Sequence, residues 1–187
     1  MRFLGIIAED QSDVDVAHEL ARKVARKEFT VRRILGHGCG RISAKARAWA
    51  AQLNQQGCTL LVLICDLDRR RLDELSKSLL IALHPCPIQQ SIVVIPVREI
   101  EAWLLADHDA ITRALKLPRP LKKQPNPEAI QNPKERLRDL IRERSKGHIT
   151  YLNTVHNVKI AKHIQVQNLD RCPAFSPFET FIRTNLG

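Results

Sequence analysis

The apolar residues in the first half of the chain follow two alternating patterns. Short runs of consecutive apolar residues predict strands, and stretches with an apolar residue at every third or fourth position predict helices. The predicted strands lie at residues 2–8, 29–35, 59–65 and 91–97. The predicted helices between them lie at residues 13–27, 42–55 and 70–83, and the expected N-cap of the first is Ser12 or Asp13. This alternation predicts right-handed crossover connections and an α/β fold, a mainly parallel sheet of about four strands with helices on both faces.

After the fourth strand the pattern becomes helical. The predicted helices lie at residues 99–106, 109–115 and 133–146, and shorter ones follow. Residues 117–133 contain five of the ten prolines and predict an irregular connection, and a second irregular break is expected at 172–177. We therefore expect an α/β core over residues 1–107 and a helical, basic portion over residues 108–187 that packs on the core.

Composition narrows the class of protein. The length of 187 residues allows one domain with an appendage, and 44% hydrophobic residues suffice for a packed core. The net charge of +10 favours phosphate-rich partners, whereas 4% aromatic residues argue against a single-strand binder built on base stacking. The longest apolar run, residues 60–65, is too short to cross a membrane, and the N-terminus resembles a strand more than a signal peptide.

The cysteines predict a reducing environment. Their number is odd and none forms a Cys-x-x-Cys pair, so we expect reduced thiols in a cytoplasmic protein and neither a disulfide framework nor a structural zinc site. The five are Cys39, Cys58, Cys65, Cys86 and Cys172.

Acidic residues follow three of the predicted strands. Glu9 follows the first strand, Asp66 and Asp68 follow the third, and Glu99 and Glu101 follow the fourth. The carboxyl ends of parallel strands form the ligand-binding edge of an open sheet. In an extended segment, Asp66 and Asp68 would point to the same side. Carboxylates gathered in this way suit Mg²⁺ or Mn²⁺, and the chemistry expected of such a site is phosphodiester cleavage.

The residues alone also allow a purely structural role for these acids. Acids are common in loops after strands, where they cap the next helix, and Asp68 would be such a cap for the helix predicted to begin near Arg70. Three acidic strand ends at one edge of a sheet make a functional site an equal alternative.

The acidic segments resemble the TOPRIM fold, the catalytic domain of topoisomerases, primases and the nucleases of the overcoming-lysogenization-defect group. Members have a Glu after the first strand and an Asp-x-Asp after the third, matched here by Glu9 in IIAEDQSD and by Asp66 and Asp68 in LVLICDLD. The family usually has Gly after the Glu, where this chain has Asp10.

The chain resembles more closely a bacterial TOPRIM-like family of unknown function. The resemblance lies in EIEAWLLAD at 99–107, NPKE at 132–135 and CPAFSPF at 172–178. It implies that Asp66 and Asp68 hold Mg²⁺, that Glu9 is a metal ligand or a general acid/base, and that Glu101, with or without Glu99, completes the site. It also implies a role in defence against phage or mobile DNA beside a P-loop ATPase partner.

Basic residues predict the contact with nucleic acid. Residues 113–146 contain eleven basic and four acidic residues, a net charge of +7. We expect phosphate contact there, and the alternative is a solvated helix face with internal ion pairs. The candidate contacts are Arg41, Lys134, Arg136, Arg138 and Arg142. Of these, Lys134 is the predicted cation beside the acids. The glycine-rich GHGCG segment at 36–40 lacks the residues of a P-loop and predicts a tight turn.

The first functional hypothesis is therefore a metal-dependent nuclease that acts on DNA or RNA. The second is a non-catalytic nucleic-acid-binding or regulatory subunit of a P-loop ATPase system. A phosphoacceptor receiver domain also has acids at its strand ends, but the sequence shows no fifth strand that ends in Lys. The sequence leaves a homo-oligomer open.

Overall fold

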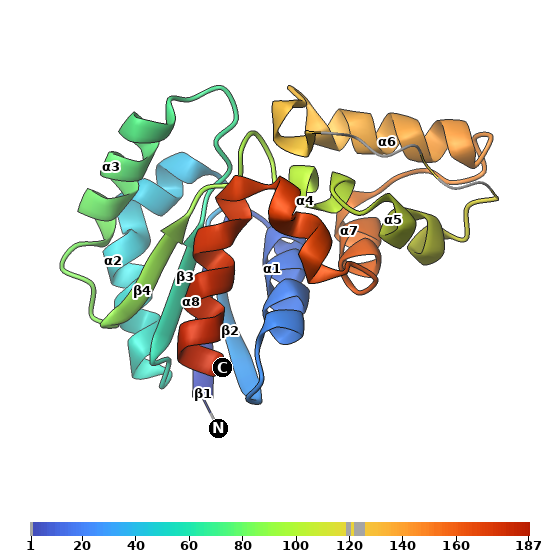
Figure 1. Ribbon diagram of the computed structural model, residues 1–187. Coiled ribbons are helices and arrows are strands. Elements are labelled where there is room, and N and C mark those ends of the chain that lie inside the picture. Colours follow the sequence, from blue (N-terminus) through green and yellow to red (C-terminus); the bar gives the residue numbers. More distant parts are fainter. Residues whose placement is uncertain (1, 119–120, 122–125) are drawn as a thin grey trace.

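The computed structural model of the chain describes residues 2–118, 121 and 126–187. Its centre is a sheet of four parallel strands in the order β2-β1-β3-β4 (Figure 1). The strands are β1 (Arg2–Ala8), β2 (Phe29–Leu35), β3 (Leu60–Ile64) and β4 (Gln90–Val94). In the register of the sheet, Ile7 of β1 lies between Ile34 of β2 and Leu63 of β3. The prediction of an α/β fold with a parallel sheet flanked by helices is confirmed.

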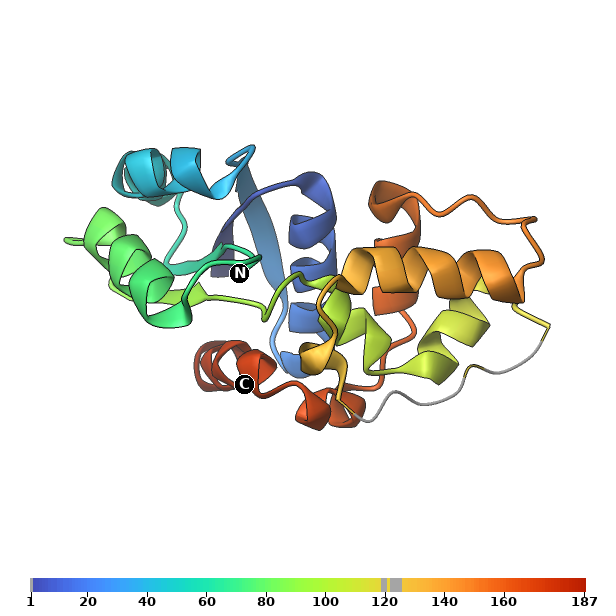
Figure 2. The same ribbon diagram turned by 90° about the horizontal axis from the view of Figure 1, so that it is seen from above.

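Helices cover both faces of the sheet (Figures 1 and 2). α1 (Gln11–Val24) and α8 (Ser176–Leu186) lie on one face, and α2 (Cys39–Gln55) and α3 (Leu72–Leu83) lie on the other. Four further helices lie beyond α1, on the side away from α2 and α3. They are α4 (Glu101–Leu105), α5 (His108–Leu115), α6 (Pro133–Arg144) and α7 (Asn153–Ala161). The 3₁₀ turn Pro127–Ala129 precedes α6, and the turns Val166–Arg171 and Pro173–Phe175 lead into α8.

β3 shows why the sheet needs helices on both faces. All five of its residues are buried, and successive side chains point to opposite sides of a strand. Leu60, Val62 and Ile64 pack in the core with α1 and α8, whereas Leu61 and Leu63 pack in the core with α2 and α3. The continuous apolar run in the sequence is therefore the mark of a central strand.

The C-terminal portion shares the first of these cores. Trp103 of α4 is fully buried, and its ring packs edge-on against Phe175 at 5.2 Å. The backbone N–H groups of Arg26 and Lys27 donate to the carbonyl oxygen of Leu186 at 2.8 and 3.0 Å. The end of the chain is thus fixed beside the loop that joins α1 to β2.

Several element boundaries differ from the predictions. α2 begins at Cys39, three residues before the predicted start, and α4 begins at Glu101. The cap of α1 is Asp10, not Ser12 or Asp13, because its carboxylate accepts the Asp13 N–H and Asp13 accepts the Asp10 N–H in return. Residues 119–120 and 122–125 of the predicted irregular segment, with the basic Arg119, Lys122 and Lys123, lie outside the described residues. None of the described helices has the length and apolar character that a membrane crossing needs.

The prediction that all cysteines are reduced is wrong for two of them. Cys39 and Cys65 form a disulfide, and Cys58, Cys86 and Cys172 are free. The N–H groups of Gly36 and His37 donate to the carbonyls of Ala8 and Glu9. The loop after β2 therefore crosses the end of β1 and brings Cys39 to the end of β3. This proximity arises from the crossover connection, so the spacing of the two cysteines in the sequence does not reveal it.

Candidate active site at the carboxyl end of the sheet

The switch point of the sheet lies between the ends of β1 and β3, and the acids Glu9, Asp13, Asp66 and Glu101 around it are together called the crevice. The chain leaves β1 toward β2 through α1, then returns past β1 to β3 through α2 on the opposite face. A reversal of this kind leaves the strand ends at the switch point open to ligands. Glu9 and Asp66 lie at these two strand ends, and the Asp66 N–H donates to Glu9 Oε1 at 3.1 Å. Two of the predicted site residues therefore meet at the switch point.

Asp13 joins these acids from the first turn of α1. Its side chain is almost fully buried. Burial, followed by the nearby carboxylates of Asp10 and Glu101, raises the pKa of Asp13 to about 8. Burial and the carboxylates of Asp13 and Glu101 likewise raise the pKa of Asp66 well above its usual range. These carboxyl groups are therefore too buried and too close to be ionised together at neutral pH without a cation.

Glu101 is the most deeply buried acid of the crevice, with a side chain that is 2% exposed. Its Oε1 accepts a hydrogen bond from Asn157 Nδ2 at 3.0 Å and lies 3.5 Å from the hydroxyl of Tyr151. Its Oε2 has no hydrogen-bond partner among the residues that the structure describes. Burial raises the pKa of Glu101, while Lys134 and Asn157 act in the opposite direction. A buried carboxylate oxygen without a donor is costly and calls for a cation or a proton.

Lys134 enters the crevice from the start of α6. Its Nζ lies 3.8 Å from Glu101 Oε1, and its backbone N–H donates to Glu99 Oε2 at 2.8 Å. Burial alone would lower the pKa of Lys134, but Glu101, Glu99 and Asp66 raise it. The structure thus places Lys134 beside the acids. Glu99 contacts the N-terminus of α6 and holds this helix at the edge of the crevice.

Asp68 is the exception among the predicted acids. The segment after β3 is not extended, because Asp68 adopts a left-handed backbone conformation with φ 51°. Its side chain is 55% exposed, and its Oδ2 accepts from Arg70 Nη2 at 2.9 Å. The expectation that Asp66 and Asp68 point to one side of an extended segment is therefore wrong. The same Arg70 nitrogen lies 3.9 Å from Glu9 Oε1, so the guanidinium spans Asp68 and Glu9.

The predicted nucleic-acid contacts are divided between two helices. Arg41 is exposed on the first turn of α2, at the loop that crosses the end of β1. On α6, Arg138 pairs with Glu135 and Asp139, and Arg142 pairs with Asp139, all at 3.5–3.7 Å. Part of the basic character of α6 is thus balanced within the helix. Arg136 is exposed on the same helix.

The donor set of the crevice suits a hard cation. Glu9, Asp13, Asp66 and Glu101 offer carboxylate oxygens, the ligands that Mg²⁺ and Mn²⁺ prefer. The orphaned oxygen of Glu101 and the raised pKa of Asp13 are the features that a bound cation would relieve. Sulfur does not compete as a ligand here. Cys65 Sγ lies 3.3 Å from Glu9 Oε1, but it is joined to Cys39 in the disulfide.

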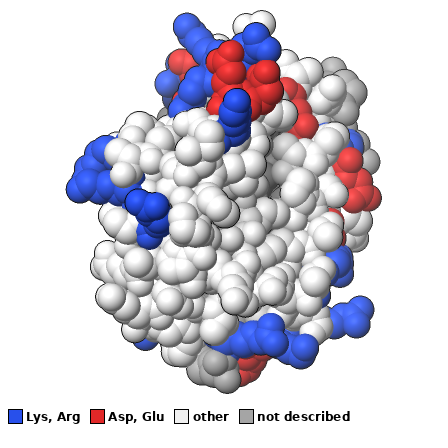
Figure 3. Space-filling view, turned by 90° about the vertical axis from the view of Figure 1, so that its left-hand side faces the viewer, with Lys and Arg blue, Asp and Glu red and all other residues white. Residues whose placement is uncertain are grey.

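Charged side chains gather at this end of the molecule. Figure 3 shows basic and acidic residues side by side at the top, which is the end where the strands finish. Below them, the face over α2 and α3 is largely uncharged, and Leu80 and Ile81 of α3 are exposed there.

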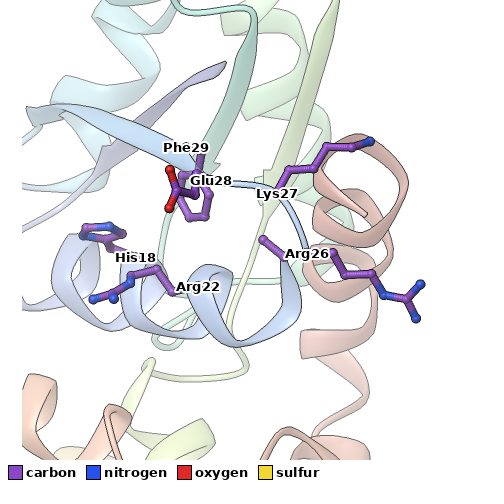
Figure 4. Close-up of a pocket in the computed structure, with 7 residues that line it drawn as sticks. His18, Arg22, Arg26, Lys27, Glu28 and Phe29 are labelled. Carbon is purple, nitrogen blue, oxygen red and sulfur yellow. The ribbon is translucent and has the colours of Figure 1, made fainter. Parts of the chain in front are cut away.

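A cavity of about 470 Å³ lies at the opposite end of the sheet, between the end of α1 and the start of β2. In Figure 4, Arg26 and Lys27 extend away from this cavity, while His18 lies near Phe29. These two rings make an edge contact at 5.9 Å. The lining has no group of convergent acids, so this cavity offers no comparable chemistry.

Three of the crevice residues escaped the sequence analysis. The sequence predicts Asp13 only as a helix cap, although its position four residues after Glu9 places both at the entry to α1. Asn157 and Tyr151 come from the far C-terminal portion and carry no motif. Their role becomes visible only when α7 packs against α1.

The fold and the crevice define a class: an α/β protein with a doubly wound parallel sheet and a cluster of acids at its switch point. Within this class, the chain belongs to the family described as a domain of unknown function, DUF4276, whose model matches residues 8–183. The match includes all the residues of the crevice. No curated protein and no solved structure matches the chain.

Proposed function

We propose that the protein is a nuclease of the TOPRIM type that uses Mg²⁺ or Mn²⁺ to hydrolyse phosphodiester bonds in DNA or RNA. One observation carries the proposal. Glu9, Asp13 and Glu101 lie near enough to Asp66 for their charges to raise its pKa, and the buried Glu101 Oε2 has no hydrogen-bond donor among the described residues. Such a set of hard oxygen donors is suited to a divalent cation.

The site has the parts that phosphodiester hydrolysis needs. A divalent ion, when bound, would polarise the phosphate and lower the pKa of a water molecule. The side chain of Glu9 is 21% exposed, and its carboxylate accepts backbone hydrogen bonds from Asp66 and Cys39. Burial still raises the pKa of Glu9, so this carboxylate is the candidate proton acceptor. Lys134, with a raised pKa, stays charged at neutral pH and can stabilise negative charge that develops on the phosphate.

The polar residues behind the acids hold them in place. Asn157 connects Glu101 with Ser12, at 3.0 and 2.9 Å, and Tyr151 donates to the Asn157 side-chain oxygen. Asn153 Nδ2 lies 3.4 Å from Asp10 Oδ2 at the cap of α1. These contacts link α7 to the start of α1 and to Glu101 at the start of α4, so packing between helices positions part of the crevice.

The test is a cleavage assay on supercoiled plasmid, linear duplex, single-stranded DNA and RNA with Mg²⁺ or Mn²⁺. Wild-type protein is compared with Asp66→Asn and with the control Asp73→Asn. Asp73 is an exposed acid of α3 that pairs with Arg71, so its substitution makes the same charge change outside the crevice. We expect metal-dependent cleavage that Asp66→Asn reduces at least 100-fold and that Asp73→Asn leaves unchanged. Equal loss in both variants, or none in either, would contradict the assignment of the site.

The context that the resemblance implies is part of the same proposal. It places the nuclease in the cytoplasm, in defence against phage or mobile DNA beside a P-loop ATPase. Cleavage that appears only after such an ATPase is added would support this arrangement. Nucleic-acid binding without cleavage in its presence would favour a non-catalytic subunit.

A further inference from the structure

A second cavity, of about 450 Å³, opens beside the acidic crevice. One wall is the loop after β3 and another is the loop after β4. Gln131 and Asn132, just before α6, form the third. Three arginines line it: Arg69 and Arg70 from the first loop and Arg98 from the second. Asp68 and Glu99 also line it, so the cavity and the crevice share an edge.

Two residues in strained backbone conformations hold the two loops together. Asp68 and Arg98 both have positive φ angles, of 51° and 65°, which side chains with a Cβ rarely adopt. The Asp68 N–H donates to the Arg98 carbonyl at 2.8 Å, and Arg98 Nη1 donates to the Asp68 carbonyl at 2.8 Å. Strain that the surrounding structure maintains in this way is frequent at ligand sites. Its effect here is to hold the Arg98 guanidinium at the cavity.

Two of the arginines that line the cavity are not neutralised by an acidic side chain. Asp68 is paired with Arg70, and Glu99 accepts from the backbone of Lys134. Within the described part of the chain, neither Arg69 nor Arg98 forms a side-chain ion pair. Guanidinium groups offer two parallel N–H donors, which match the oxygens of a phosphate. No aromatic side chain lines the cavity among the residues that the structure describes, so these residues offer no platform for a base.

We propose that this cavity binds a backbone phosphate of the nucleic acid, next to the phosphodiester at the acidic crevice. The inference rests on the proposed function for the identity of the polymer. Arg69 and Arg98 contact the phosphate, and Arg70 connects the two sites because it reaches both Asp68 and Glu9. Contacts to phosphate alone carry no sequence information, so binding here is independent of sequence.

The test is the affinity for fluorescein-labelled 12-residue oligonucleotides, single-stranded and duplex, measured by anisotropy. Ca²⁺ replaces Mg²⁺, so that a hard cation is present at the carboxylates. The variants are Arg69→Ala, Arg98→Ala and the matched control Arg71→Ala. Arg71 belongs to the same run of three arginines but pairs with Asp73 and Glu74 and does not line the cavity. Thermal unfolding of each variant verifies that it is folded.

We expect Arg69→Ala and Arg98→Ala each to raise Kd by about tenfold, the effect of one charge-assisted hydrogen bond. The slope of log Kd against log salt should fall by about 0.7 for single strands and about 0.9 for duplex per substitution. Arg98→Lys should recover part of the affinity, and Arg71→Ala should leave Kd and slope unchanged. The experiment measures binding and not cleavage, so it tests the phosphate site independently of the proposed nuclease activity. Loss of affinity in a protein that cuts nothing would support the inference while the proposed function fails. Equal affinities for all variants in a protein that cuts, or no binding by the wild type, would overturn the inference.

Discussion

Asp13 offers the sharpest test of the acidic crevice. Its carboxyl is buried beside Asp10 and Glu101, and its pKa rises from 3.8 to about 8. One pKa unit corresponds to about 1.4 kcal/mol, so a rise of about four units means that ionising Asp13 in the folded protein costs roughly 6 kcal/mol if Asp13 alone carries the cost. Asp66 and Glu101 share the same crowding of charge, and Lys134 offsets part of it. We therefore expect Asp13→Asn to recover about 1–3 kcal/mol when the group would otherwise be ionised.

The sign of the pH effect follows from proton binding. Between pH 4 and pH 8 the folded protein keeps a proton on Asp13 that the unfolded chain has released, so the free energy of unfolding falls as pH rises through this window. Above pH 8 the folded protein bears the full cost of the charge. The stabilisation by Asp13→Asn is therefore expected at pH 8, as a rise of about 2–10 °C in Tm, and little change is expected at pH 4. Asn retains one side-chain oxygen, which can still accept the Asp10 N–H.

The assay is thermal unfolding by circular dichroism in EDTA at pH 4, 6 and 8, followed by the same series in Mg²⁺. In Mg²⁺ the order should reverse at pH 8. The cation stabilises the wild-type carboxylates, and the amide of the variant is a weaker ligand. A Tm difference that stays constant from pH 4 to pH 8, or a variant less stable than wild type in EDTA at pH 8, would refute the electrostatic account of the crevice.

Two further substitutions test the groups around the acids. Lys134→Gln removes the cation that lies 3.8 Å from Glu101 Oε1. Single-turnover cleavage should slow about 100-fold or more, while the Kd for the oligonucleotide should change less than tenfold. A larger effect on binding than on rate would instead make Lys134 a simple phosphate contact. Asn157→Ala removes a hydrogen-bond donor from the buried Glu101 carboxylate. It should lower the free energy of unfolding by about 2–3 kcal/mol, which is a fall in Tm of roughly 4–12 °C at pH 8. The fall should be smaller at pH 4, and an equal fall at both pH values would indicate lost packing alone.

The sequence revealed the strands and their order in the chain because hydrophobic periodicity is a local property. The buried run of β3 and the amphipathic stripe of α1 both predicted the correct elements. The placement of Glu9 and Asp66 at one edge followed from the rule that parallel strands end on the same side. The position of Lys134 at the start of a helix rich in basic residues likewise predicted that it lies beside the acids.

What the sequence could not reveal depends on contacts between distant segments. Cys39 and Cys65 meet because the loop after β2 crosses the end of β1. Asn157 reaches Glu101 only through the packing of α7 on α1. The exposed position of Asp68 depends on the left-handed backbone conformation of this one residue, which the alternation of apolar and polar residues does not encode. Local rules therefore located the edge of the sheet, and tertiary packing decided which side chains face the crevice.

The cation site is tested most directly by calorimetric titration of the protein with Mn²⁺ at pH 7.5. Wild type and the control Asp73→Asn should bind Mn²⁺ alike. Asp66→Asn and Glu101→Gln should each weaken binding at least tenfold, since each removes one carboxylate oxygen from the crevice. Equal Mn²⁺ affinity in all four proteins, or no binding by the wild type, would contradict the claim that the acids at the switch point form a cation site.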